Sequence, residues 1–342
     1  MGDDDEALRL IKRVEELETV DDARGGKRPL HIAAKHGRFA AIERLIAVRV
    51  NVNTTSGPAV TAVYLAVQQG HAAVVELLFG ARADVSAARS DGVTPVMLAA
   101  QKGNMATLQL LIGAKADINA VMSDGVTFLI LAAQKGLTAA LELLIGANAD
   151  VNAAMSNGAT AVFMAAQDGH TAALKLLIGA KADVNAAPSN GTTPVKIAAQ
   201  NGDTAALKLL ISAKADVNAA RSDGLTPVML ATQKGDTTAL ELLIGAKADV
   251  NAADCDGDTP VRMAIQKGHS AVVELLIGAK ADINAVMSDG VTFLILAAQK
   301  GLTAALELLI GANADVNAAM SNGATAVFMA AQDGHTAALK LL

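Results

Sequence analysis

Hydrophobic and polar positions along the chain repeat with a fixed period of 33 residues. In residues 91–123, a short apolar run follows a Thr-Pro pair, and a second stripe at Leu108, Leu111 and Ile112 has the i, i+3, i+4 spacing of a helix. Each run predicts a helix of about ten residues or fewer, which is too short to persist alone in water. We therefore expect pairs of short helices that are held by neighbouring pairs.

The unit recurs with substitutions but no insertions along nearly the whole chain of 342 residues. Such a period predicts an all-α solenoid, in which stacked helix-turn-helix units form one continuous domain. Ten units are present, the last one truncated, and each carries a glycine at the same place: Gly37, Gly70, Gly103, Gly136, Gly169, Gly202, Gly235, Gly268, Gly301 and Gly334.

Turn and cap residues indicate where the helices begin and end. Asp91-Gly92 has the chemistry of a turn, Thr94 is placed as an N-cap, and Pro95 suits the first position of a helix that runs to about Gln101. We expect the second helix of a unit to begin after a capping side chain, as at Asn104, Asp203 and Asp236.

Residues 3–18 have a different pattern from the repeats. Leu8, Leu10, Ile11, Val14 and Leu17 fall at helical spacing, and four acidic residues crowd the start, where negative charge suits the helix dipole. Since the end of a solenoid needs a polar outer face, we expect residues 1–24 to be a capping helix with its lead-in, and the repeat array to span residues 25–342.

Motifs within the units resemble the ankyrin repeat, over about residues 25–342. The resemblance rests on the period and on the order of residues in RPLHIAA (28–34), TPVMLAA (94–100) and TPVMLA (226–231). It implies paired antiparallel helices with fingers like β-hairpins at right angles to them. It also implies that partner proteins bind in the groove formed by the fingers and the first helices.

Several positions depart from the family pattern. The family histidine is kept at His31, but its place is later taken by Tyr64, Met97, Ile130, Phe163, Lys196, Met229, Arg262, Ile295 and Phe328. The family glycine after the paired leucines is replaced by a long polar residue, so we expect a non-glycine residue to adopt a left-handed conformation there, at a cost of roughly 1 kcal/mol. The replacements are Arg49, Arg82, Lys115, Asn148, Lys181, Lys214, Lys247, Lys280 and Asn313.

A long duplication lies within the array. Residues 110–177 reappear letter for letter as residues 275–342, an offset of five repeats. A partner that recognises the first copy could therefore recognise the second. The sequence ends at Leu341-Leu342 inside an expected helix, so we expect further repeats or self-association to cover that end.

Composition and charge exclude several classes of partner. The net charge is −6 and aromatic residues make up 2%, which argues against nucleic-acid binding. No apolar run is long enough to span a membrane, and the first residues lack the features of a secretory signal. Because Cys255 is the single cysteine, we expect an intracellular, reducing compartment, most naturally the cytoplasm, with an organelle left open.

Residue patterns of catalysis and of metal or cofactor binding are absent from the sequence. The histidines lack metal-ligand spacing with a third ligand, and the glycines form no phosphate-binding loop. Acidic residues such as Asp117 and Asp150 recur in nearly every unit, which favours a structural role. We therefore expect no cofactor, no metal and no enzymatic activity.

Our first functional hypothesis is a scaffold that binds partner proteins through the groove. Its motivation is that unequal residues occupy the fingers and the first helices of an otherwise monotonous frame, and that methionine suits adaptable contacts. The candidate partner-binding residues are Arg89, Val93, Met97, Lys102, Met122, Val126, Ile130, Lys135, Met155, Phe163, Asp168, Arg221 and Met229.

The alternative hypothesis is a structural or accessory subunit of a larger assembly, which could be membrane-associated. The chain is 52% hydrophobic, and the outer face of the second helices is rich in small residues that let a neighbour approach closely. A good helix former on a tolerant surface explains the alanines equally well. The candidate outer-face residues are Gly113, Ala114, Ala139, Ala172, Gly179 and Ala180.

Overall fold

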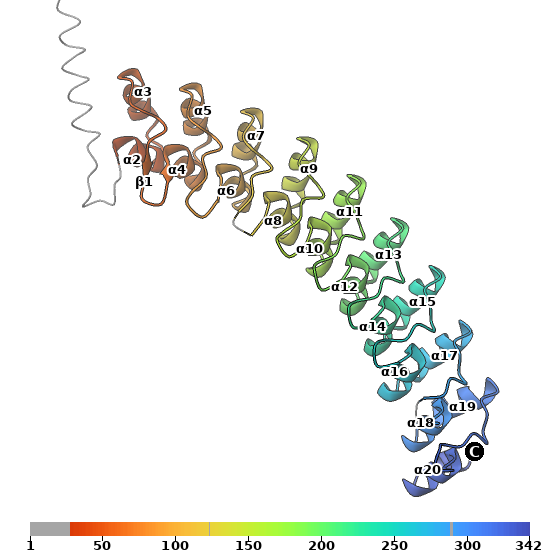
Figure 1. Cartoon of the computed structure of the whole chain (residues 1–342). Helices are drawn as coiled ribbons and strands as arrows, with labels where there is room; N and C mark the ends of the chain where they lie inside the picture. Colours follow the sequence, from red (N-terminus) through yellow and green to blue (C-terminus); the bar gives the residue numbers. More distant parts are fainter. Residues whose placement is uncertain (1–27, 123, 288–289) are drawn as a thin grey trace, which may run out of the picture. The chain divides into compact units, whose positions relative to one another are not determined.

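Paired short helices make up nearly all of the regular structure, which confirms an all-α solenoid (Figure 1). The computed structural model describes residues 28–122, 124–287 and 290–342. The capping helix expected in residues 1–24, and its boundary with the array, lie outside the described residues.

Each pair consists of a first and a second helix. The first helices are α2 (Pro29–Lys35), α4 (Ala62–Gln69), α6 (Pro95–Gln101), α8 (Phe128–Gln134), α10 (Ala161–Gln167), α12 (Pro194–Asn201), α14 (Pro227–Lys234), α16 (Pro260–Lys267), α18 (Phe293–Gln299) and α20 (Ala326–Gln332). The second helices are α3 (Phe39–Ala47), α5 (Ala72–Gly80), α7 (Met105–Gly113), α9 (Thr138–Gly146), α11 (Thr171–Gly179), α13 (Thr204–Ser212), α15 (Thr237–Gly245), α17 (Ser270–Gly278), α19 (Thr303–Gly311) and α21 (Thr336–Leu339).

The described residues divide into two compact units, one within residues 28–165 with 179–182 and the other within residues 166–178 with 183–342. Within each unit, first helices pack against first helices and second helices against second helices, as α2 does with α4 and α3 with α5. The core lies between these layers and is built from alanine, leucine and valine, with few aromatic side chains. Because each repeat has the same residue pattern and makes the same contacts, the sequence within a repeat determines how its helices pair.

Most first helices begin at the expected threonine caps, although α2 begins after Arg28 and Thr193 makes no capping hydrogen bond to α12. Thr94 Oγ1 accepts a hydrogen bond from the backbone N–H of Met97, and Pro95 follows at the first helical position. The second helices have the expected caps too, where Asn104, Asp203 and Asp236 each accept from the N–H three residues later. Side-chain capping of this kind is worth about 1 kcal/mol per helix.

The left-handed conformation expected after each second helix is confirmed. All nine residues at this place have positive φ, between 58° at Lys115 and 65° at Arg82. The backbone turns back here, so that Ala116 N–H donates to Leu111 O at 3.0 Å. An asparagine tolerates this conformation better than a lysine, but a lysine adds a cation at the helix C-terminus, which is favoured by roughly 0.3–1 kcal/mol.

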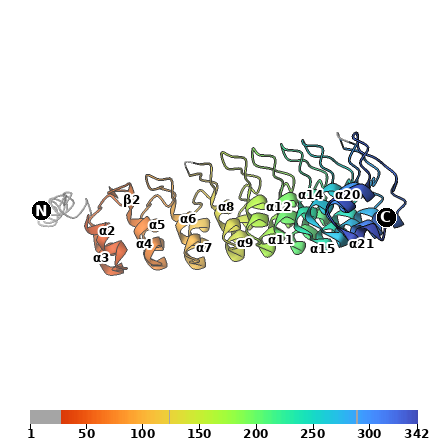
Figure 2. The ribbon, with the colours of Figure 1, turned by 90° about the horizontal axis from the view of Figure 1, so that it is seen from below.

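A finger connects each helix pair to the next, and the fingers project to one side of the helices within each unit (Figure 2). One finger contains two short strands, β1 (Thr55–Ser56) and β2 (Val60–Thr61), which pair antiparallel. Further fingers have single bridges such as Val121 with Thr127. These pairings confirm the hairpin-like fingers that the family resemblance implies.

Neighbouring fingers approach each other closely at a glycine. Gly224 has a φ of +86°, and a Cβ added to it would lie 2.7 Å from Cα of Asp254 in the next finger. No other residue type fits this place, because both the backbone conformation and the space require glycine. The fingers therefore stack in a defined register.

Side-chain hydrogen bonds also join successive repeats at the base of the fingers. Asn218 Oδ1 accepts from the backbone N–H of Asp249 at 2.8 Å, and Asp249 Oδ1 accepts from the N–H of Asn251 at 2.8 Å. Asp117 and Asp150 make the same contact to the residue two places ahead, Asn119 and Asn152. These aspartates are thus structural, as their recurrence indicated.

Candidate protein-binding surface

The candidate residues on the fingers sit on a rigid backbone. Met122 N–H donates to Val126 O at 3.0 Å, and Arg89 and Arg221 make the equivalent bond to Val93 and Leu225. Each of these finger side chains, and that of Met155, is partly exposed. The hairpin therefore fixes the backbone, while the side chains remain accessible to a partner.

Two fingers carry an arginine beside an aspartate. Arg89 Nε donates to Asp91 Oδ1 at 2.9 Å, and the guanidinium also lies over the Tyr64 ring, 5.8 Å from its centroid. Arg221 pairs with Asp223 in the same way and lowers the pKa of that carboxyl to about 2. These contacts hold both arginines in place at the finger surface.

The aspartate of a third ion pair lies in a less polar setting. Asp258 and Arg262 form the pair, one from a finger and one from α16. Burial raises the pKa of Asp258 and outweighs the opposing effect of Arg262. Arg262 occupies the family histidine position but remains partly exposed.

Exposed polar side chains follow one another at the ends of the first helices. Lys102, Lys135 and Asp168 are exposed there, as expected for residues that could meet a partner. The same place holds Lys234, Lys267 and Lys300 in three successive repeats, all exposed. Our sequence interpretation did not select these three lysines, although the 33-residue period could have found them.

Four candidate residues are not on the surface, which corrects our expectation for them. Met97, Ile130, Phe163 and Met229 are buried within the stack. They occupy the third position of a first helix, where His31 points inward and Nε2 lies 3.0 Å from Thr54 O. The apolar replacements fill the same internal space, so they contribute to packing and not to a binding surface.

Lys196 occupies the same internal position. Its side chain is 0% exposed, and Nζ donates to the carbonyl of Gly191 in the preceding finger. Burial, with a smaller contribution from the nearby Arg221 cation, lowers the pKa of Lys196. A buried ammonium is costly unless it is fully paired, so we expect this residue to weaken the stack.

The outer-face candidates are accessible. Gly113, Ala139, Ala172 and Gly179 are exposed, and Ala114 and Ala180 are partly exposed. A Cβ added to Gly113 or Gly179 would meet no atom within 4 Å, so packing within the chain does not require glycine there.

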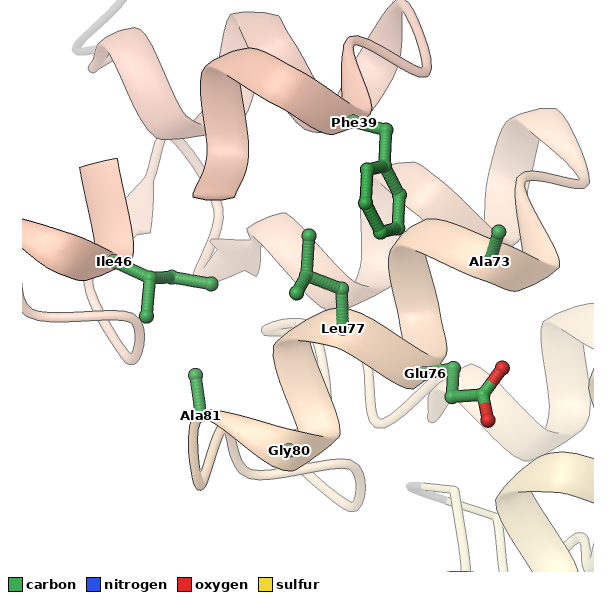
Figure 3. Close-up of a pocket in the computed structure, with 7 residues that line it drawn as sticks. All are labelled: Phe39, Ile46, Ala73, Glu76, Leu77, Gly80 and Ala81. Carbon is green, nitrogen blue, oxygen red and sulfur yellow. The ribbon is translucent and has the colours of Figure 1, made fainter. Parts of the chain in front are cut away.

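Two open depressions lie on the helices of the first repeats. One, of about 500 Å³, is lined by Phe39 and Ile46 of α3 and by residues of α5 such as Leu77, with Glu76 as its single charged group (Figure 3). The other, of about 590 Å³, is lined by residues of α2 and α3 and by Val48, which follows α3. Neither was expected from the sequence, because these helices follow the same pattern as all the others.

Within the described ranges, no cluster of three or more histidine, cysteine, aspartate or glutamate side chains could hold a metal ion. No helix in the same ranges is long and apolar enough to cross a membrane. Cys255 is a free, exposed thiol on a finger.

Comparison with known proteins identifies the repeats. The family model for ankyrin repeats, in a form that spans three copies, matches residues 2–89, 63–155, 129–221 and 196–287. Together these overlapping matches cover most of the chain. A search of curated proteins finds no match.

Proposed function

The chain belongs to the ankyrin-repeat family, whose repeats are generally protein–protein interaction modules, and on this premise we propose that it is a non-enzymatic scaffold that binds a partner protein across its fingers and first helices. The partner contacts would come from the exposed candidates on the fingers and at the ends of the first helices. The four buried candidates would stabilise the first helices by packing in the core.

One observation carries the proposal: the finger backbone is constant while its first side chain varies. The same N–H to carbonyl bond closes the fingers that begin with Arg89, Met155, Arg221 and Asp254. A constant backbone that displays unlike side chains can present a specific pattern to a partner. Recognition of a specific partner requires different side chains on successive fingers, whereas stacking of the repeats does not.

Exposed apolar residues on two fingers also support the proposal. Val121 and Val286 are 59% and 64% exposed, next to the partly exposed Met122 and Met287. Apolar surface rimmed by polar groups marks interaction sites, and methionine adapts its shape to a partner. Both valines belong to the duplicated sequence, so the chain displays the same apolar pair twice.

The duplication determines how the proposal must be tested. Substitution of Met122, Met155 and Lys135 alone leaves the second copy intact, at Met287, Met320 and Lys300. The test is therefore to change all six residues to alanine in the full chain and to quantify the proteins recovered with it from its native source. We expect at least a tenfold loss of the specific partner, because a few side chains near the centre of an interface each cost more than about 1 kcal/mol when truncated.

A matched control changes exposed residues in or directly after the second helices of both copies: Glu142, Lys175, Glu307 and Lys340 to alanine. This control should retain the partner, and both variants should keep the wild-type circular dichroism spectrum. Retention of every partner by the six-residue variant would contradict the proposal. So would loss of the partner from the control. The outer-face alternative gains no supporting observation, and we do not propose it.

A further inference from the structure

The first described repeat exposes a face that is more buried in most of the repeats that follow it. Ala41 on α3 is exposed, whereas the equivalent Val74, Ala140 and Ala338 are buried. Ile32 on α2 is 37% exposed, but the equivalent Leu65 is buried. Ala338 belongs to the last repeat and is buried, so this position is exposed only where the side of a repeat that contacts the preceding helix pair has no described neighbour.

This face is hollowed and mostly apolar. The depression of about 590 Å³ is lined by Pro29 and Ala33 of α2 and by Ala41, Arg44 and Leu45 among the residues of α3. Leu45 is only partly buried there, whereas Leu78, Leu111 and Leu144, its equivalents, are fully buried. The depression thus has the chemistry of an internal repeat interface that lacks its neighbour.

We propose that residues 3–18 form a helix that lies in this depression and covers it with Leu10, Val14 and Leu17. Leu10, Val14 and Leu17 share one face at helical spacing, and sixteen residues would form a helix about 24 Å long. The occupant is part of the same chain, and the proposal is independent of any partner protein.

The short connection to α2 favours residues 3–18 as the segment that occupies the depression. Residues 19–27 separate it from Arg28, the N-cap residue of α2, whose first residue, Pro29, lines the depression. Nine residues can span at most about 30 Å, so the segment is confined close to this face. Confinement by a short linker corresponds to a millimolar effective concentration, which an untethered protein rarely reaches.

The charges of the two surfaces are complementary. Residues 3–18 contain seven carboxylates against three cations. Residues 28–50, which form the first repeat, contain a single carboxylate, Glu43, against five cations: Arg28, Lys35, Arg38, Arg44 and Arg49. Opposite charge favours docking and discourages a second copy of the first repeat from binding the same face.

A disulfide-trapping experiment in the full chain tests the proposal directly. In a Cys255→Ser background, Ala41→Cys is combined in turn with Leu10→Cys, Val14→Cys or Leu17→Cys, and with Lys12→Cys as the control on the opposite side of the helix. A disulfide requires Cβ atoms about 3.5–4.5 Å apart. We expect at least one of the first three pairs to form a cross-link within one chain at least tenfold faster than the control.

Three results would overturn the proposal. Equal rates for all four pairs would mean that the tether alone brings the thiols together. Cross-linked dimers would assign the face to a second copy of the chain. Absence of any cross-link would indicate that another protein, and not residues 3–18, covers this face.

Hydrogen exchange supplies a second, independent measurement. Val14→Asp should raise the exchange rates of the amides in α2 and α3 at least tenfold, while Lys12→Asp leaves them unchanged. The helices α12 to α16 serve as the internal reference for folding in both variants. Unchanged exchange in α2 and α3 of the Val14→Asp variant would contradict the proposal.

Discussion

The third residue of most first helices is buried, and this position accepts very different side chains. His31 satisfies one ring nitrogen there through Thr54 O, and Met97, Ile130 and Phe163 fill the same place with apolar atoms. An apolar side chain needs no hydrogen-bond partner, so these substitutions are tolerated as long as the volume fits. A charged side chain is the exception, because it must be both desolvated and paired.

Lys196 provides the test of this argument. Its pKa is lowered in the folded chain, so the folded state releases the proton at a lower pH than the unfolded state does. Between the lowered pKa and the ordinary value of 10.5, the unfolded state binds more protons, and stability must rise with pH. Below this window the charged lysine carries its full burial cost.

We expect Lys196→Met to stabilise the chain at pH 7 by about 1 kcal/mol or more, because methionine needs neither hydration nor a counter-charge. The substitution should also remove the rise of stability at alkaline pH. Urea unfolding at pH 7 and at pH 9 to 10 measures both effects. A less stable variant at pH 7 would show that the Lys196 contact to Gly191 outweighs the cost of burial.

The end of each second helix is where the repeat departs most from ideal backbone chemistry. Nine residues other than glycine adopt left-handed φ there, seven of them lysine or arginine. The strain of roughly 1 kcal/mol is partly offset by a cation near the helix C-terminus. The backbone strain and the charge effect both act only at their own helix end, so each end contributes separately to the free energy of unfolding.

Lys214, with a φ of 63°, is a suitable position for testing this balance because it follows a complete second helix, α13. We expect Lys214→Val to destabilise the chain by about 1–2 kcal/mol, since a β-branched residue is disfavoured at positive φ. Lys214→Asn should change stability by less than about 0.5 kcal/mol, because asparagine tolerates this conformation. Thermal unfolding of both variants measures the difference, and equal losses would show that charge, not backbone strain, dominates.

At the scale of the whole molecule, the duplicated sequence gives an internal comparison of one sequence in two places. The helices α8 and α18 are identical in sequence, and their inward residues are buried alike. Phe163 and Phe328 are also equivalent, yet Phe163 is 7% exposed and Phe328 is 57% exposed. Phe328 lies in the last helix pair of the described chain, so no further pair covers it.

The same substitution should therefore have two different effects. We expect Phe163→Ala to cost about 3–5 kcal/mol, the range for removing a buried phenylalanine. Phe328→Ala should cost less than about 1 kcal/mol, because most of its surface is already in water. Urea unfolding followed by circular dichroism compares the two variants, and similar losses would indicate that Phe328 is covered in solution.

The sequence by itself determined the period, the helix pairs, the threonine, asparagine and aspartate caps, and the left-handed residues after the second helices. All of these depend on residues close together in the chain, such as Thr94 with Met97, so local patterns suffice to predict them. It also placed the fingers and the exposed candidates Lys102, Lys135 and Asp168 on accessible surface.

Only the tertiary structure decided which residues are buried by a neighbour. Met97, Ile130 and Met229 were selected as contacts because they vary, but a position that faces the next repeat can vary too, provided that its volume is filled. The exposure of the face on α2 and α3 could not be predicted from the sequence, for the same reason. Burial depends on which elements pack against a residue. The phenylalanines at positions 163 and 328 lie in identical sequence, so the sequence alone does not predict that one is buried and the other exposed.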